Sequence, residues 1–258
     1  MRLKDRVAIV TGGAEGLGKA YAMGFSREGA KVVIADINLE AAKATAEEVV
    51  KNGGEALAIR TDVSKLEDTL EMAKKTVERF GRIDILVNNA AAFSRVMISK
   101  GTPFYELDLD EVDKVIAVNF KGVLLCARAV FPHMKAQGGG KIINITSTQV
   151  YLGGAAGLRY AHYIGTKAGV IGLTRAFARE IGEFNINVNC LCPGSTSTED
   201  PSITAILELR KAHADAAQSI KGVQYPEDIV GTAIFLASSD SDRITGQTII
   251  VDSGDVMI

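Results

Sequence analysis

Short apolar runs alternate with longer amphipathic stretches along the whole chain. The short runs are rich in valine and isoleucine, which favour strands, whereas the longer stretches repeat apolar residues with the period of a helix. Helical periodicity is clear in 18–29, 38–53, 66–81 and 167–182. The predicted strands are VAIVT (7–11), KVVIAD (31–36), ALAIRTD (56–62), IDILVNN (83–89), KIINITS (141–147), INVNCLCP (186–193) and QTIIVD (247–252).

Seven strands separated by helices predict a parallel sheet, because parallel neighbours need a crossover of about a dozen or more residues. The nearly continuous apolar character of the strands indicates that helices cover both faces. We therefore expect one α/β domain that spans 1–258. The least regular segments, 91–107 and 194–225, follow strands and are the expected walls of a substrate site.

Composition and charge remove several classes of function. Hydrophobic residues make up 47% and charged residues 23%, and the 29 basic and 31 acidic residues leave a net charge of −2. This balance argues against a nucleic-acid or membrane partner, and no stretch reads as a signal peptide or approaches the length of a membrane span. Three cysteines and three histidines without ligand spacing predict no metal site, no disulfide framework and a cytoplasmic location.

The first predicted strand leads into the glycine-rich segment TGGAEGLGKA, 11–20. Glycines between a strand and a helix let the backbone turn tightly and approach a pyrophosphate, whose charge then lies at the helix N-terminus. The alternative is a tight turn without a ligand. The position of the loop between a first strand and a second strand that ends in an acid favours dinucleotide binding through Gly12, Gly16 and Gly18.

Asp36 ends the second strand, where a carboxylate can accept hydrogen bonds from the adenosine ribose. A phosphate on that ribose would be repelled by roughly 6–7 kcal/mol before salt screening, at about 5 Å and an effective dielectric of about 20. Ile37 and Asn38 provide no basic side chain, and Glu15 adds negative charge. The expected cofactor is NAD, although an exposed aspartate at a strand end is the alternative.

The segment RYAHYIGTK, 159–167, contains two tyrosines and one lysine. If it opens a helix, Tyr163 and Lys167 are neighbours on one face, whereas Tyr160 has Ile164 in the corresponding position. A neighbouring ammonium and a positive nicotinamide ring would lower the phenol pKa by ~2–3 units, which needs about 3–4 kcal/mol. We therefore expect Tyr163 to act as the acid/base, and Tyr160 either to line the pocket or only to pack.

These motifs together resemble the short-chain dehydrogenase/reductase superfamily along essentially the whole chain. The matching residues are TGxxxGxG at Thr11–Gly18, NNA at Asn88–Ala90, Asn119 in VNFKG, Ser147 in NITS, YxxxK at Tyr163–Lys167 and PG at Pro193–Gly194. The resemblance implies a Rossmann-type, doubly wound single domain with a seven-stranded parallel sheet. It also implies that Ser147 binds the substrate oxygen, Lys167 holds the nicotinamide ribose and Asn119 supports a proton-relay water.

The resemblance also implies the residues that contact the cofactor, and among them Asp62 and Val63 match the adenine position and Thr198 matches the carboxamide position. Asn88 is expected beside them. The full expected set is Gly12, Glu15, Gly16, Leu17, Gly18, Asp36, Ile37, Asp62, Val63, Asn89, Ala90, Ala91, Tyr163, Lys167, Pro193, Gly194, Thr196 and Thr198.

The chain departs from the family pattern in two places. Ala91 replaces the usual glycine after NNA, which a small backbone adjustment would accommodate. The interval from Ser147 to Tyr163 is 163 − 147 = 16 residues, about three more than usual, and we expect GGAAG, 153–157, to absorb the excess.

The substrate is the least determined expectation, because one fold serves many reactions. NITSTQVY, YAHYIGTK and the segment after Ile244 are most similar to bacterial secondary-alcohol dehydrogenases of the phenylethanol type. An aromatic or alicyclic alcohol and ketone pair is expected. The alternatives are a 3-oxoacyl thioester reductase, a sugar-alcohol or hydroxysteroid dehydrogenase, and a silent NAD-binding regulator.

The expected pocket residues are mainly apolar or aromatic, and the family resemblance implies a homotetramer. The expected pocket set is Phe93, Thr148, Gln149, Tyr151, Leu152 and Tyr160, with Val96, Val150, Ile206, Leu207 and Leu209 as further wall residues.

Overall fold

The structure is a computed structural model that describes residues 1–92, 101–154, 159–198 and 204–258, except for the side chains at 204–207 and 209. Its centre is a seven-stranded sheet in the order β3-β2-β1-β4-β5-β6-β7, with every neighbouring pair parallel. The strands are β1 (Val7–Thr11), β2 (Lys31–Asp36), β3 (Ala56–Arg60), β4 (Ile85–Asn88), β5 (Gly140–Ile145), β6 (Ile186–Pro193) and β7 (Thr248–Val251). The expected doubly wound parallel sheet is confirmed.

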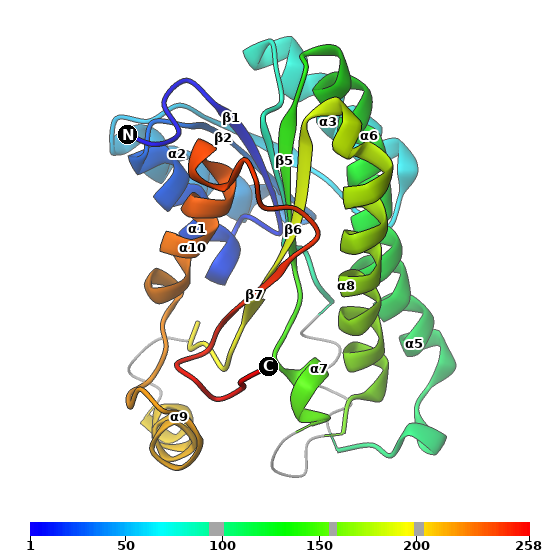
Figure 1. Ribbon diagram of the computed structural model, residues 1–258, viewed down its shortest axis with the longest axis vertical. Helices are drawn as coiled ribbons and strands as arrows, with labels where there is room; N and C mark the ends of the chain where they lie inside the picture. The colour runs from blue at the N-terminus through cyan, green and yellow to red at the C-terminus, as the bar shows by residue number, and fades with distance from the viewer. Residues whose placement is uncertain (93–100, 155–158, 199–203) are drawn as a thin grey trace.

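Helices cover the sheet on both sides, as Figure 1 shows. One face carries α1 (Gly16–Arg27), α2 (Leu39–Lys51) and α10 (Pro226–Ala237), and the other carries α3 (Leu66–Phe80), α6 (Gly122–Ala136) and α8 (Ala161–Ile181). The remaining described helices are α5 (Leu109–Ile116), α7 (Gln149–Leu152) and α9 (Thr204–Ala217), with the shorter turns η1 (Phe104–Glu106), η2 (Ala117–Lys121), η3 (Gly182–Phe184) and η4 (Ser239–Ser241).

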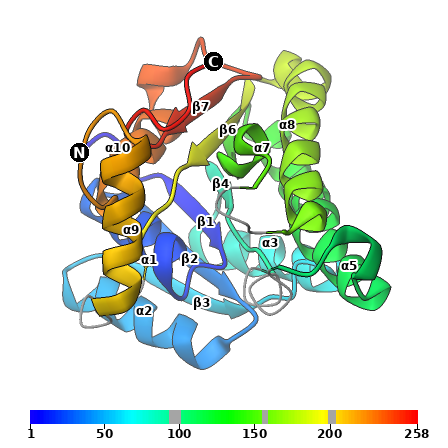
Figure 2. The ribbon, with the colours of Figure 1, turned by 90° about the horizontal axis from the view of Figure 1, so that it is seen from below.

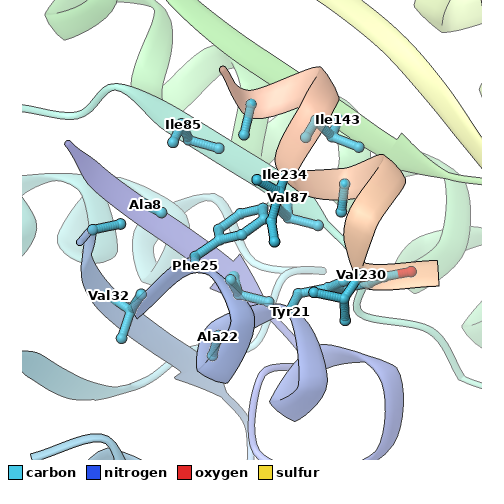
Figure 3. Packing of buried hydrophobic residues seen from close by; sticks show 14 of the residues in the cluster. Ala8, Tyr21, Ala22, Phe25, Val32, Ile85, Val87, Ile143, Val230 and Ile234 are labelled. Atoms are coloured by element: carbon cyan, nitrogen blue, oxygen red, sulfur yellow. The ribbon is translucent and has the colours of Figure 1, made fainter. Parts of the chain in front are cut away.

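Strand alternation divides the core into two apolar layers. In β1, Ala8 and Val10 face α1 and α10, while Ile9 faces the layer beneath α3 and α6. Figure 3 shows the first layer, where Phe25 of α1 lies near Ile234 of α10. Since both strand faces are buried, the strands need apolar residues at nearly every position, which explains their continuous hydrophobic runs.

One continuous helical run, Leu109–Ala136, is long and apolar enough to cross a membrane, with a mean hydropathy of 1.6 over an 18-residue window. The expectation that no segment approaches a membrane span was therefore wrong in length and composition. Half of that window is buried inside the fold, because α6 packs against α3 and the central strands. This is the pattern of a core helix.

The strand order reverses between β1 and β4, and a ligand crevice forms outside the carboxyl ends of the strands at such a point. The segments that follow β1, β4, β5 and β6 all leave the sheet at the carboxyl ends of the strands. They lie there together with α7 and α9, toward the lower end in Figure 1. Figure 2 views the molecule from that end. The sequence motifs with predicted chemistry thus come together at the carboxyl ends of the strands.

Candidate active site

The loop after β1 has the tight geometry that its glycines predict. Gly12 and Gly16 adopt φ values of +60° and +53°, which side-chain-bearing residues rarely adopt. A Cβ on Gly12 would lie 2.8 Å from the Cα of Ala90, and one on Gly18 would collide with the carbonyl of Gly12. Glycine is therefore required for the close approach of the loop, helix α1 and the segment after β4.

The N-terminus of α1 is open toward this loop. Its N-cap residue, Glu15, is exposed and makes no side-chain capping hydrogen bond. The first-turn amides of Gly16, Leu17 and Gly18 therefore keep the positive end of the helix available for a phosphate. This arrangement fits the diphosphate of a dinucleotide.

Thr11 and Asn89 hold the glycine loop in place, a role that sequence reasoning missed. The Asn89 side-chain amide donates to the carbonyls of Thr11 and Gly12 at 3.1 and 3.0 Å. The Thr11 hydroxyl accepts hydrogen bonds from the backbone amides of Asn89 and Ala90. The signal was available, because an amide side chain at a strand end beside a glycine loop often satisfies backbone groups.

Asp36 lies at the end of β2, beside the loop. Its carboxylate accepts hydrogen bonds from the backbone amides of Ala14 and Asn38 at 3.2 and 3.0 Å. The neighbouring Ile37 side chain is 62% exposed. No hydrogen bond or ion pair of the described residues places a lysine or arginine on Asp36, whose carboxylate has only backbone amides as partners.

The two residues expected at the adenine follow β3. The Asp62 carboxylate accepts hydrogen bonds from the amide and hydroxyl of Ser64, at 3.0 and 2.6 Å. Val63 is buried against Gly122, where a Cβ on the glycine would lie 2.9 Å from a Val63 methyl. Val63 thus packs the segment after β3 against Gly122 of α6, while Asp62 stabilises the turn of that segment through Ser64.

The end of β4 carries Asn88, and Ala91 follows it. Asn88, expected to line the cofactor, is buried, and its side-chain amide donates to Asn144 at 2.8 Å. Asn144 in turn donates to Thr174 on α8 at 2.8 Å. This polar chain ties β4, β5 and α8 together, so Asn88 supports the sheet. Ala91 is exposed and outside the positive-φ region, so it accommodates a methyl without left-handed strain.

Ser147, Tyr163 and Lys167 meet at the carboxyl ends of β5 and β6. Ser147 follows β5, and its hydroxyl is hydrogen-bonded to Tyr163. Tyr163 and Lys167 lie one turn apart on α8 and are 8% and 3% exposed. The Lys167 ammonium donates to the carbonyl of Ile145 at 2.8 Å and lies 5.7 Å from the centre of the Tyr163 ring.

Asn119 lies in η2, a π-helical turn that joins α5 to α6. Its carbonyl oxygen accepts from the amide of Ala92 at 2.8 Å, and its amide donates to the hydroxyl of Thr166 at 3.4 Å. Thr166 donates to the Tyr163 carbonyl at 2.7 Å. The π-turn, which frequently marks functional positions, therefore links Asn119 to the catalytic helix through Thr166, a contact that the sequence did not indicate.

Comparison with known proteins agrees with this geometry. A family model described as enoyl-(acyl carrier protein) reductase matches residues 12–255. A short-chain type dehydrogenase/reductase from Mycobacterium marinum superposes with a TM-score of 0.88 at 30% identity, over 98% of this chain and 96% of that one. The chain belongs to the short-chain dehydrogenase/reductase family.

Several curated relatives of this short-chain dehydrogenase/reductase have names that specify substrates, and two of them illustrate the range. The (2S)-[(R)-hydroxy(phenyl)methyl]succinyl-CoA dehydrogenase subunit BbsD of Thauera aromatica is 39% identical over 98% of both chains. A sorbitol dehydrogenase of Cereibacter sphaeroides is 39% identical over the full length of both chains. Two relatives that are equally identical to this chain are thus named for an aromatic thioester and for a sugar alcohol.

Burial, rather than charge pairing, dominates the titration of the two central residues of this short-chain dehydrogenase/reductase. Desolvation raises the pKa of Tyr163 to about 12, against the lowering effect of its hydrogen bond with Ser147. Desolvation also lowers the pKa of Lys167 to about 8. The expected lowering of the tyrosine pKa depended on a positive nicotinamide ring as well as on Lys167, and in the chain alone desolvation outweighs the compensating charge.

Tyr160 is the N-cap residue of α8, outside its regular helical turns, and makes no side-chain capping hydrogen bond. It is 7% exposed, and its ring meets the Tyr163 ring edge-on with a centroid separation of 5.8 Å. Burial raises its pKa as well. Of the two tyrosines, Tyr163 is the one that the contacts of the described residues place beside Ser147 and Lys167.

The long interval between Ser147 and Tyr163 contains helix α7, which the sequence analysis did not predict. The amide of Gln149 donates to the Ser147 hydroxyl at 3.3 Å, and Thr148 is buried. Val150 and Tyr151 pack against a cluster on α8 and β6 rather than against Tyr160, and Leu152 ends the helix. The segment 153–157 lies largely outside the described residues, as do Phe93, Val96 and the side chains of Ile206, Leu207 and Leu209.

The loop after β6 borders the glycine loop. The amide of Gly194 donates to the Val251 carbonyl at 3.0 Å, and a Cβ on Gly194 would lie 2.6 Å from that of Asp252. Pro193 ends β6, Thr196 pairs with Gln224, and a Cβ on Gly16 would lie 3.5 Å from a Thr198 carbon. Thr198 therefore lies close to the glycine loop.

Proposed function

We propose that this short-chain dehydrogenase/reductase interconverts a secondary alcohol and a ketone with NAD(H), on a small aromatic or alicyclic substrate. The observation that carries the proposal is the buried group of Ser147, Tyr163 and Lys167, which lies at the same sheet edge as an open dinucleotide loop. When bound, the nicotinamide cofactor supplies or accepts the hydride. The remaining chemistry belongs to the side chains.

In ketone reduction the Ser147 hydroxyl orients the substrate oxygen, and Tyr163 donates its proton to that oxygen. A phenol with a pKa of about 12 is fully protonated at neutral pH, so the acid form is ready. Alcohol oxidation needs the phenolate, which costs about 7 kcal/mol at pH 7 in the protein alone. A positive charge near the phenol reduces this cost, so the oxidative direction depends more strongly on bound charge.

Lys167 provides part of that charge. Its pKa of about 8 keeps most of it protonated at neutral pH, and only one of its three N–H groups is used by the Ile145 carbonyl. The others can bind the nicotinamide ribose. Asn119, whose carbonyl oxygen holds Ala92, positions the opposite wall and could pass a proton to solvent through a water.

Asp36 supports NAD over NADP. Its carboxylate is held at the end of β2 by two backbone amides, so it cannot swing away from a ribose phosphate without losing both hydrogen bonds. The described residues provide no cation there to compensate. An NADP-dependent thioester reductase is the second candidate, supported by the family-model description and by the name of the Thauera relative.

Buried aromatic surface supports the substrate class. Tyr160, Tyr163 and Val115 form one small cluster with Ala92 and Ile164, and a flat apolar ring packs well against such edges. A sugar alcohol, as in the name of the Cereibacter relative, would need more hydrogen-bonding groups than this cluster offers. We further propose a cytoplasmic homotetramer without metal, nucleic-acid or membrane partners.

The test is nicotinamide absorbance with NAD⁺ or NADP⁺ and a panel of phenylethanols, cyclohexanols, 3-hydroxyacyl thioesters, sugar alcohols and hydroxysteroids. Turnover of aryl or alicyclic alcohols with NAD⁺ supports the proposal. Turnover only of thioesters with NADP⁺ replaces it with the second candidate. NAD binding without turnover of any substrate would support a regulatory protein instead.

A further inference from the structure

The first turn of α8 carries Tyr163 but has no side-chain cap. Its N-cap residue, Tyr160, makes no capping hydrogen bond with its side chain, and 155–158 lie outside the described residues. Within the part of the chain that the structure describes, this turn is therefore held mainly by side chains that pack against neighbouring elements. Figures 1 and 2 both show α5 beside this part of α8.

The helical run of α5 and η2 contacts α8 at intervals of four residues, which places the contacts along one side of the run. Val115 packs in one apolar cluster with Tyr163. One turn later, Asn119 donates to the hydroxyl of Thr166 at 3.4 Å. One turn earlier, Glu111 faces the first turn of α8. The acid/base therefore lies between two polar contacts of the same helix pair.

His162 is the residue that Glu111 faces, and it directly precedes Tyr163. Its side chain is 1% exposed, and Nε2 of the ring lies 3.7 Å from Oε1 of Glu111. Neither ring nitrogen has a hydrogen-bond partner among the described residues. A buried polar group without a partner costs about 1–3 kcal/mol. The ring is therefore a candidate for a contact that forms during the reaction cycle.

The imidazole is neutral at pH 7. Burial lowers the pKa of His162, against the raising effect of the Glu111 charge. A neutral imidazole has one N–H donor and one acceptor nitrogen, and the carboxylate of Glu111 can accept from the donor. An approach of about 0.9 Å would bring the two side chains from 3.7 Å to hydrogen-bond distance. Such a bond to a carboxylate is stronger than one between two neutral groups.

We propose that His162 is a positioning residue for Tyr163, which holds the first turn of α8 against α5 through a hydrogen bond with Glu111 during proton transfer. The inference rests on the proposed acid/base role of Tyr163. A misplacement of about 1 Å can lower a rate about 100-fold, so a residue that does not touch the substrate can control the reaction. A histidine that only fills space is the simpler interpretation, and the two interpretations differ in which side chains can replace the ring.

The test compares two replacements of His162 by steady-state kinetics. His162→Gln keeps a neutral donor and acceptor, whereas His162→Phe keeps a buried ring without nitrogen. We expect kcat to fall about 10- to 100-fold in the Phe variant and less than about threefold in the Gln variant. KM and dinucleotide affinity should change little in both, because the contact acts on proton transfer. The reverse order of the two variants would show that the ring only fills space.

A double-mutant cycle tests the partner of the imidazole. Glu111→Ala should lower kcat as His162→Phe does, and the double variant should be about as slow as either single variant. Asp113→Ala removes an exposed acid of α5, and its small effect should add to that of His162→Phe. Urea unfolding of every variant separates a loss of stability from a loss of rate. Additive effects of the Glu111 and His162 replacements would overturn the proposed pair.

Tyr163→Phe distinguishes failure of this inference from failure of the proposed function. If it abolishes turnover while His162→Phe keeps a normal kcat, the positioning role is overturned and the acid/base role stands. If it keeps turnover, both are overturned. Should His162→Phe fail to fold, Glu111→Ala decides in its place, because the Glu111 side chain is 19% exposed. An unchanged kcat in that variant overturns the proposal.

Discussion

The loop that follows β1 and the helix that carries Tyr163 treat their polar groups differently. Beside the loop, Asp36 at the end of β2 is half-buried and its carboxylate accepts hydrogen bonds from two backbone amides, while the first amides of α1 have no side-chain cap. On α8, Tyr163 and Lys167 are buried, and desolvation displaces both pKa values against the ionised forms. The expected dinucleotide binding therefore depends on the backbone geometry of the glycine loop. The expected reactivity depends on ionised forms of Tyr163 and Lys167 that burial disfavours.

The largest expected effect is on α8. Tyr163→Phe removes the proton donor, and we expect kcat to fall about 10³-fold or more. Tyr160→Phe keeps the ring that packs edge-on against Tyr163 and should change kcat less than about threefold. Steady-state kinetics on the preferred substrate checks both. If Tyr163→Phe leaves kcat unchanged and Tyr160→Phe abolishes turnover, Tyr160 rather than Tyr163 is the acid/base.

The same contrast explains what the sequence could predict. All seven strands were predicted to within about two residues at each end. The glycine loop, Asp36, Ser147, Tyr163 and Lys167 could be proposed as site residues because each is identified by local pattern. Asn144, Thr166 and α7 were missed, since their roles depend on contacts between segments far apart in the chain. The desolvation that raises the pKa of Tyr163 in the chain alone was not part of the sequence argument, because burial is a property of the packed fold.

The loop should be sensitive to volume rather than charge. Gly18→Ala places a methyl against the Gly12 carbonyl, and we expect a loss of about 1–3 kcal/mol in the free energy of unfolding together with weaker dinucleotide binding. Gly172→Ala is the control, because a Cβ there meets nothing within 4 Å. Urea unfolding and fluorescence titration measure the two effects. Equal behaviour of the variants would show that the loop is not close-packed.

Charge in the loop region should affect selectivity only. Asp36→Asn keeps an acceptor oxygen for the Ala14 or Asn38 amide but removes the negative charge. We expect the preference for NAD⁺ over NADP⁺, measured as the ratio of kcat/KM values, to fall about 10- to 100-fold. Glu15→Gln neutralises an exposed acid of the same loop and should have a much smaller effect. A wild-type protein that already prefers NADP⁺ contradicts this role of Asp36.

The smallest expected effect is a gain in stability when Lys167 is replaced, although the same replacement should lower activity. Lys167 has a pKa of about 8 in the folded chain and about 10.4 when unfolded. Between these values the unfolded state binds more protons, so the free energy of unfolding rises with pH by about 1–3 kcal/mol through this group.

Lys167→Met removes the buried charge and this rise. It should therefore be more stable than the wild type at pH 7 by about 1 kcal/mol, with the gain reduced by the lost hydrogen bond to Ile145. Urea unfolding of both proteins at pH 7 and near pH 10 tests it, because the difference should shrink or vanish at the higher pH. A variant that is less stable at both pH values, by the same amount, would mean that the lysine stabilises the fold and that the catalytic end stores no unfavourable charge.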